Sequence, residues 1–183
     1  MKQSNRDGLK FKKPRGFLLV DGYNIIFAND ELSTLAGESL DSARRRLCDL
    51  LCDFSGITGE RVIAVYDAHL VEGGAGSVEN YYNIKIVFTK EAETADHYIE
   101  RTAQKLAKND AVSVATSDRL EQLIIAGRGA RVISAQELWI EMQNARETLR
   151  ERMHKTRSIK KNPIELLVDE ETARRLDELR YIK

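Results

Sequence analysis

The chain has 183 residues, and its 29 Lys and Arg side chains are balanced by 29 Asp and Glu side chains. This length suits one domain with short tails and is long enough to bury a core without disulfides. Hydrophobic residues make up 42% of the chain and charged residues 32%. No apolar run approaches the roughly 20 residues that a membrane-spanning helix needs. The composition therefore predicts a globular protein that is not inserted in a membrane.

Two segments are basic although the whole chain is neutral. Segment 1–16 lacks the apolar core of a secretory signal, so we expect a disordered basic leader on a cytoplasmic protein. In segment 144–161 the basic residues outnumber the two acids, Glu147 and Glu151. These basic residues are Arg146, Arg150, Arg152, Lys155, Arg157, Lys160 and Lys161. Such a segment either contacts a phosphate backbone or forms a solvated helix face, and the sequence favours neither interpretation.

Short apolar runs alternate with longer helical patterns between residues 17 and 153. The runs cover residues 17–21, 61–67, 84–89, 111–116 and 130–134. They are nearly continuous rather than alternating, which is typical of strands covered on both faces. The order of the elements predicts an α/β fold, a doubly wound parallel five-stranded sheet flanked by helices.

Local signals mark where several helices begin and which residues they bury. Thr94 and Ser117 are expected N-caps, and Ser134 with Glu137 has the spacing of a capping box. In the helix after residue 117, three apolar residues recur at helical spacing, as in a helix that packs one face on the sheet. They are Leu120, Leu123 and Ile124.

Two further segments do not fit the strand and helix alternation. Segment 73–83, GGAGSVENYYN, is rich in glycine and polar residues, and we expect a mobile loop near the site. Segment 154–183 is expected to be a basic linker followed by a C-terminal helix. The folded domain would then span residues 17–153.

Acidic residues gather at one predicted edge of this sheet. Asp21 and Asp67 end the first and second runs, and Asp118 follows the fourth. Glu93 and Asp96 begin the helix after the third run. Because parallel strands direct their carboxyl ends to one edge, all five acids fall on the edge where such sheets bind ligands. Each acid taken alone also has a structural explanation, as an N-cap or as a partner of a helix dipole.

Taken together, the acids indicate a cation. Clustered carboxylates repel one another and raise each other's pKa values unless a positive ion neutralises them. Oxygen ligands with little His or Cys nearby suit Mg²⁺ or Mn²⁺, which activate water and stabilise charge on a phosphate. We therefore expect Asp21 to be a metal ligand, Gly22 to permit a sharp turn, and Asn24 to hydrogen-bond the acids or the substrate.

Four segments in this order closely resemble the YacP-like NYN domain family, a branch of the PIN-like nucleases. They are VDGYNII at 20–26, VYDAHLV at 65–71, FTKEAETADHYIE at 88–100 and VATSDRLEQ at 114–122. The resemblance covers residues 17–153. It implies a doubly wound parallel sheet whose carboxylates hold Mg²⁺ or Mn²⁺ for hydrolysis of RNA phosphodiester bonds.

The resemblance also implies roles for individual residues. Asp21, Asp96 and Asp118 match the family's catalytic and metal-binding acids, and Asn24 matches the companion amide. Asp67 and Glu93 match the pattern as further candidate metal ligands.

The functional hypothesis is a metal-dependent endoribonuclease. Members of the family are implicated in cleaving messenger RNA on the ribosome, so RNA and the ribosome are the expected partners. Segment 146–161 would then hold the transcript or ribosomal RNA, and Arg119 can touch a phosphate or remain solvated. The alternative is a non-catalytic RNA- or ribosome-binding module on the same scaffold, because fold does not settle function. A small phosphatase or nucleotide-binding domain ranks last, because no phosphate-binding loop follows a strand.

Overall fold

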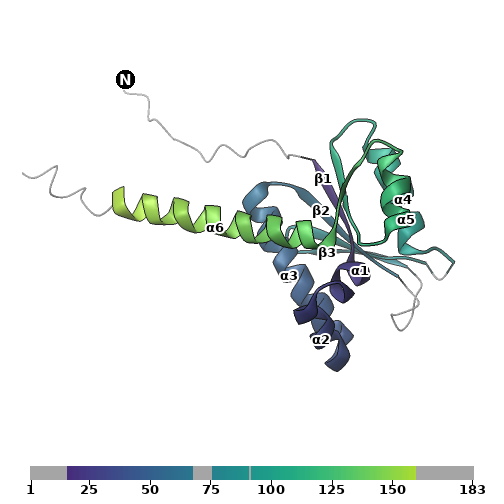
Figure 1. The fold of residues 1–183 in the computed structure, drawn as a ribbon, viewed down its shortest axis with the longest axis horizontal. Helices are drawn as coiled ribbons and strands as arrows, with labels where there is room; N and C mark the ends of the chain where they lie inside the picture. The colour runs from purple at the N-terminus through teal and green to yellow at the C-terminus, as the bar shows by residue number, and fades with distance from the viewer. Residues whose placement is uncertain (1–15, 68–75, 91, 160–183) are drawn as a thin grey trace, which may run out of the picture. The chain divides into compact units, whose positions relative to one another are not determined.

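The computed structural model describes residues 16–67, 76–90 and 92–159, with side chains up to residue 154. Within these residues, six strands form one sheet in the order β3-β4-β2-β1-β5-β6 (Figure 1). The strands are β1 (Phe17–Asp21), β2 (Arg61–Tyr66), β3 (Ser77–Tyr81), β4 (Ile84–Phe88), β5 (Val112–Ala115) and β6 (Arg131–Ile133). The helices are α1 (Gly22–Phe27), α2 (Asp30–Glu38), α3 (Leu40–Thr58), α4 (Ala95–Leu106), α5 (Arg119–Ala126) and α6 (Ala135–Ile159).

The sheet is doubly wound, which confirms the predicted fold class. Strand β1 pairs in parallel with β2 on one side and with β5 on the other. The chain first builds β2 and β4 outward from β1 and then crosses to β5 and β6. The point where the strand order reverses therefore lies between β1 and β5, and the carboxyl ends of these two strands border the crevice that such folds use for ligands.

The sheet has one strand more than the sequence predicted. Strand β3 pairs with β4 in antiparallel register, from Ser77 opposite Phe88 to Tyr81 opposite Ile84. It lies in the segment that we expected to be a loop, of which residues 73–75 lie outside the described residues. Four of its five residues are exposed, so this edge strand carries no buried apolar alternation for sequence analysis to detect.

Helices cover both faces of the sheet. Leu18 and Val20 of β1 belong to the core shared with α1, α3 and the first turns of α6. Leu19 belongs to the second core, which includes Ile99 of α4 and Ile125 of α5. Because successive strand residues point to opposite faces, the single apolar run of β1 supplies both cores. Helices α4 and α5 lie together on one side of the sheet in Figure 1.

Two of the three predicted helix starts are confirmed. Thr94 caps α4 by accepting a hydrogen bond from the backbone N–H of His97. Ser134 and Glu137 form the capping box, because the Ser134 hydroxyl accepts from the Glu137 N–H and the Glu137 carboxylate accepts from the Ser134 N–H. Helix α5 differs: its N-cap is Asp118 rather than Ser117.

The orientation of α5 also differs from the prediction. Leu120, Leu123 and Ile124 are exposed by 74%, 73% and 47% of their surface, whereas Ile125 is buried. Glu121 is buried as well, at 5% exposure. The helix therefore turns an acid toward the protein interior and three aliphatic side chains outward.

The described residues up to Arg146 belong to one compact unit, and those from Glu147 belong to a second one. The described part of the second unit is the continuation of α6. No helix of the described residues is long and apolar enough to cross a bilayer.

Candidate active site

Asp21 stands at the carboxyl end of the central strand. Its Oδ1 atom accepts a hydrogen bond of 3.0 Å from the Asn24 N–H and so caps α1. Only 7% of its surface is exposed. Buried strand residues on both sides of Asp21 in the sheet thus fix the position of this carboxylate.

Gly22 has a different role from the expected one. It lies inside α1 with ordinary helical geometry and not at a turn that requires positive φ. A Cβ at this position would approach the Cε1 atom of the buried Tyr66 to 2.1 Å. The glycine is needed because the ring of Tyr66 packs directly against the backbone next to Asp21.

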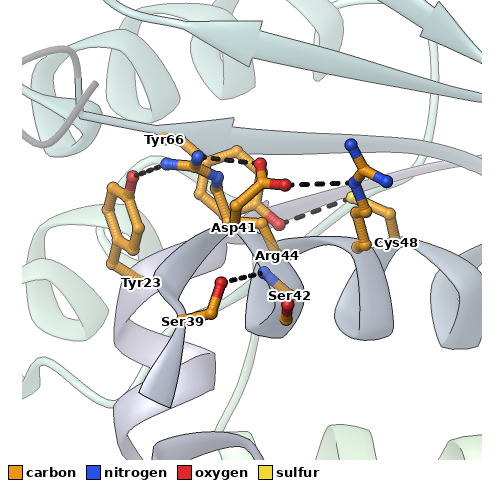
Figure 2. A network of polar contacts seen from close by, with 8 residues as sticks. Tyr23, Ser39, Asp41, Ser42, Arg44, Cys48 and Tyr66 are labelled. Carbon is orange, nitrogen blue, oxygen red and sulfur yellow. Dashed lines mark hydrogen bonds and ion pairs between the residues drawn. The ribbon is translucent and has the colours of Figure 1, made fainter. Parts of the chain in front are cut away.

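Figure 2 shows the polar contacts that support this side of the site. The Arg44 guanidinium donates to the Tyr23 hydroxyl at 2.8 Å and to Asp41 at 3.0 Å. The ring of Tyr23 packs edge-on against Tyr66, with centroids 5.1 Å apart, and Tyr66 contacts the Cys48 thiol. The first turn of α1, and with it Asp21, is therefore held from α3 as well as from the sheet.

Asp96 reaches the site from the first turn of α4. Its neighbour Ala95 is fixed by Asp67, whose Oδ1 atom accepts from the Ala95 N–H at 3.1 Å and from the Thr89 hydroxyl at 3.2 Å. Asp67, one of the candidate metal ligands, thus joins the ends of β2 and β4 to the start of α4. Asp96 itself remains exposed.

Glu121 is a site residue that sequence analysis missed. One carboxylate oxygen from each of Asp21, Asp96 and Glu121 lies within 4.8 Å of the other two, and we call these three residues the acid cluster. Both carboxylate oxygens of Glu121 are buried, and no side chain of the described residues donates a close hydrogen bond to either, although the Thr116 hydroxyl lies near enough to lower the pKa of this group. A usable signal was present, because Asp118 and Glu121 are three residues apart and residues at this spacing share one side of a helix.

Asp118 lies next to the acid cluster but is not one of its three members. Its Oδ1 atom accepts from the Leu120 N–H at 2.7 Å and from the Glu121 N–H at 3.3 Å. These bonds cap α5 and hold the backbone of Glu121. Asn24 acts across the switch point, because its amide oxygen accepts from the Ser117 N–H at 2.8 Å. Asn24 thereby ties the turn after β1 to the turn after β5.

The remaining predicted residues are not members of the acid cluster. Glu93 pairs with Arg101 at 2.5 Å. Arg119 is exposed at the start of α5. Arg146 pairs with Asp53 at 2.6 Å, and Arg150 and Arg152 are exposed on α6. The side chains of Lys155 and Arg157, and the whole of Lys160 and Lys161, lie outside the described residues.

Burial and mutual repulsion raise the pKa values of the residues in the acid cluster. Burial, together with the charges of Asp96, Asp67 and Asp118, raises the pKa of Asp21 to about 6 against the single opposing hydrogen bond from Asn24. Burial and the charges of Asp21, Asp96 and Asp118 raise the pKa of Glu121 to about 7, against the opposing effect of the Thr116 hydroxyl. The pKa of Asp96 is raised by the same two causes. Without a cation, these carboxyls therefore retain protons at pH values where exposed acids have lost them.

A doubly wound sheet with an acid cluster at its switch point fits the class of nuclease-type α/β domains, and the family comparison supports this class. The chain belongs to the YacP-like NYN domain family, whose model matches residues 18–181. It is 43% identical over 145 residues to the uncharacterized protein YacP of Bacillus subtilis (strain 168), covering 78% of this chain and 84% of that protein.

Two crystal structures of Rae1 (YacP) from Bacillus subtilis share the fold. One has a TM-score of 0.65 at 38% identity and covers 90% of this chain and 94% of the Rae1 chain. The other, of a tryptophan-to-leucine mutant, has a TM-score of 0.67 at 39% identity and covers 78% and 84%. The family membership and fold that the four sequence motifs suggested are therefore confirmed.

Proposed function

We propose that this protein is a metal-dependent endoribonuclease that hydrolyses RNA phosphodiester bonds at the acid cluster. The observation that carries the proposal is the buried carboxylate of Glu121, which lies with Asp21 and Asp96 and has no cationic partner among the described residues. An unpaired buried carboxylate is costly, and a cation shared with Asp21 and Asp96 would offset that cost.

The donor set fits Mg²⁺ or Mn²⁺. Three carboxylates from three different elements converge, and no His or Cys belongs to the group. Hard oxygen ligands of this kind suit either ion. When bound, the ion supplies a water of lowered pKa and positive charge beside the scissile phosphate.

The residues of the site would have two kinds of role, metal binding and positioning. Asp21, Asp96 and Glu121 bind the ion, and Asp118 holds Glu121 in place through the cap of α5. Asn24 keeps the two turns that carry Asp21 and Asp118 at a fixed separation. Asp67 orients α4, which brings Asp96 to the cluster. The proposal thus keeps Asp21 and Asp96 as ligands, adds Glu121, and gives Asp118, Asn24 and Asp67 positioning roles.

The substrate that we propose is messenger RNA on translating ribosomes, in the cytoplasm. Membership of a nuclease-type family supports RNA hydrolysis. The exposed Arg150 and Arg152 on α6, with Arg119, supply cations that can contact phosphates. We also propose that residues 17–153 carry the nuclease activity, with the basic leader and the C-terminal segment as accessory parts.

The test is to map transcript ends in a translating extract, with ribosomes active, stalled or removed. We expect new ends with the wild-type protein and active ribosomes, and a loss of about a thousandfold or more in Asp21→Asn, Asp96→Asn and Glu121→Gln. The matched control is Glu31→Gln, which neutralises an exposed acid on α2 that pairs with Arg46. Retained cleavage in Glu121→Gln would refute the metal assignment. No ends under any condition would favour the non-catalytic binding module.

A further inference from the structure

Helix α5 is oriented against its own amphipathicity. Leu120 and Leu123 are more than 70% exposed, while the charged Glu121 between them is buried. A helix that packs on a sheet ordinarily does the reverse, because apolar burial is the main source of helix stability in a folded protein. The acid cluster explains why Glu121 points inward, but it does not explain why aliphatic residues occupy the outer positions.

Two of the three exposed aliphatic residues line a pocket that also contains site acids. The pocket has a volume of about 200 Å³ and opens between α4 and α5. One wall is formed by Asp96, His97 and Glu100 of α4, and the other includes Leu120 and Ile124 of α5. Asp118, Glu121 and the buried Ile125 complete the lining, so the apolar wall is continuous with the acids. Leu123, although equally exposed, does not line this pocket.

We propose that Leu120 and Ile124 form the wall against which a nucleobase packs when its phosphate lies at the acid cluster. This inference rests on the proposed function and deepens it, because it assigns the residues that hold the nucleotide next to the scissile bond. The base would be unstacked from its neighbours and enter the pocket between α4 and α5. Contact of aliphatic groups with a base face needs no hydrogen bonds, so it would position any base and select weakly among them.

The chemistry of the pocket favours a nucleotide over a protein side chain. An occupant must present an anion toward a cation held by the carboxylates and a flat apolar surface toward Leu120 and Ile124. A nucleotide carries a phosphate and a base on one sugar and meets both demands. A hydrophobic side chain of a partner protein would meet only the second. A partner protein lying on α5 would also cover Leu123, which is outside the pocket.

This difference between Leu123 and the pocket residues gives a matched control. The variants Leu120→Ser, Ile124→Ser and Leu123→Ser each remove an exposed aliphatic group from the same helix, so each should fold. We expect cleavage of ribosome-bound transcripts to fall about tenfold in Leu120→Ser and Ile124→Ser, and to stay within about twofold in Leu123→Ser. An equal fall in all three variants would overturn the proposal in favour of a protein partner on the whole face. No fall in any variant would also overturn it.

A binding measurement separates failure of this inference from failure of the proposed function. The wild-type full chain, labelled at its methyl groups and backbone amides, is titrated with hexauridine and with the same oligonucleotide carrying abasic central nucleotides. Ca²⁺ replaces Mg²⁺, so that the strand can bind without being cut. We expect the methyl resonances of Leu120 and Ile124 to shift with hexauridine at least five times more than with the abasic strand, while Leu123 does not move. Shifts at Asp21 and Glu121 amides alone would leave the nuclease proposal standing and refute the base contact. A third outcome would overturn the base contact. If RNA did not shift the methyl resonances, and if the protein formed dimers that Leu120→Ser abolished, this face would bind a second copy of the chain.

Discussion

Helices α3 and α5 flank opposite faces of the same sheet and use their apolar residues in opposite ways. Helix α3 buries Leu47, Leu51 and Phe54 in the core that it shares with β1 and β2. Helix α5 buries Ile125 together with the acid Glu121 and leaves Leu120 and Leu123 exposed. Helix α3 buries its apolar face, which is how amphipathic helices stabilise a fold. Helix α5 instead buries an acid beside the acid cluster, and a functional requirement at the cluster explains this exception.

The largest loss of stability among the tests of this contrast is expected for a substitution in α3. Leu51 is fully buried, so Leu51→Ala should lower the free energy of unfolding by about 2 to 5 kcal/mol, through lost burial and the cavity left behind. Urea unfolding followed by circular dichroism measures the change. A loss below about 1 kcal/mol would show that α3 is loosely packed and that the contrast with α5 is false.

The acid cluster should make the metal-free protein less stable as pH rises. The folded pKa values of Asp21 and Glu121, about 6 and about 7, lie above the ordinary 3.8 and 4.5. The folded state therefore binds more protons, and its stabilisation is fully present below about pH 4 and lost between about pH 4 and 7. We expect a loss of roughly 1 to 3 kcal/mol, smaller than the two shifts combined because the groups are coupled.

Thermal unfolding of the chelator-treated protein at pH 5 and pH 8 measures the part of this loss that falls above pH 5. Mg²⁺ or Mn²⁺ should restore stability at pH 8 and have little effect at pH 5, where protons compete for the carboxylates. The same experiment on Asp21→Asn with Glu121→Gln should show a flatter pH dependence. Equal stability at both pH values in the wild-type protein would mean that the cluster is better solvated than its burial indicates.

Replacing the buried acid by an apolar residue should exchange function for stability. In Glu121→Leu, a side chain of similar size takes the place of a buried carboxylate that has no cationic partner among the described residues. The free energy of unfolding at pH 8 should rise by about 1 kcal/mol while cleavage is lost. Destabilisation would show that Glu121 has a structural partner, such as a bound water, and would weaken the case that its position serves a metal.

The sequence predicted those features that local patterns determine. The five parallel strands follow from continuous apolar runs, and the caps at Thr94 and Ser134 follow from residue type and spacing. Strand β3 was missed because its exposed polar residues are ordered by pairing with β4, a partner that no local pattern reveals. The orientation of α5 was missed because apolar spacing shows that a helix is amphipathic but cannot show which face the protein buries.

The sequence predicted which acids lie at the edge of the sheet, but it did not predict all the members of the acid cluster. Asp21 and Asp96 could be placed at one edge from strand order alone, and the structure brings them together. Glu121 was overlooked because its helix was assigned the wrong buried face. Asp118 and Asp67 were found as acids at the correct edge, but only the three-dimensional contacts show that they cap and brace the helices beside the cluster.

The smallest expected effect belongs to Leu123. Because its side chain is 73% exposed, Leu123→Ala should change the free energy of unfolding by less than about 0.5 kcal/mol, the range of ordinary surface substitutions. Both variants are measured under the same conditions. The difference between the changes in free energy of unfolding in Leu51→Ala and Leu123→Ala then quantifies the contrast between α3 and α5. A loss above about 1 kcal/mol would mean that the outer face of α5 is covered in solution, and the reason for its aliphatic residues would then be packing rather than contact with RNA.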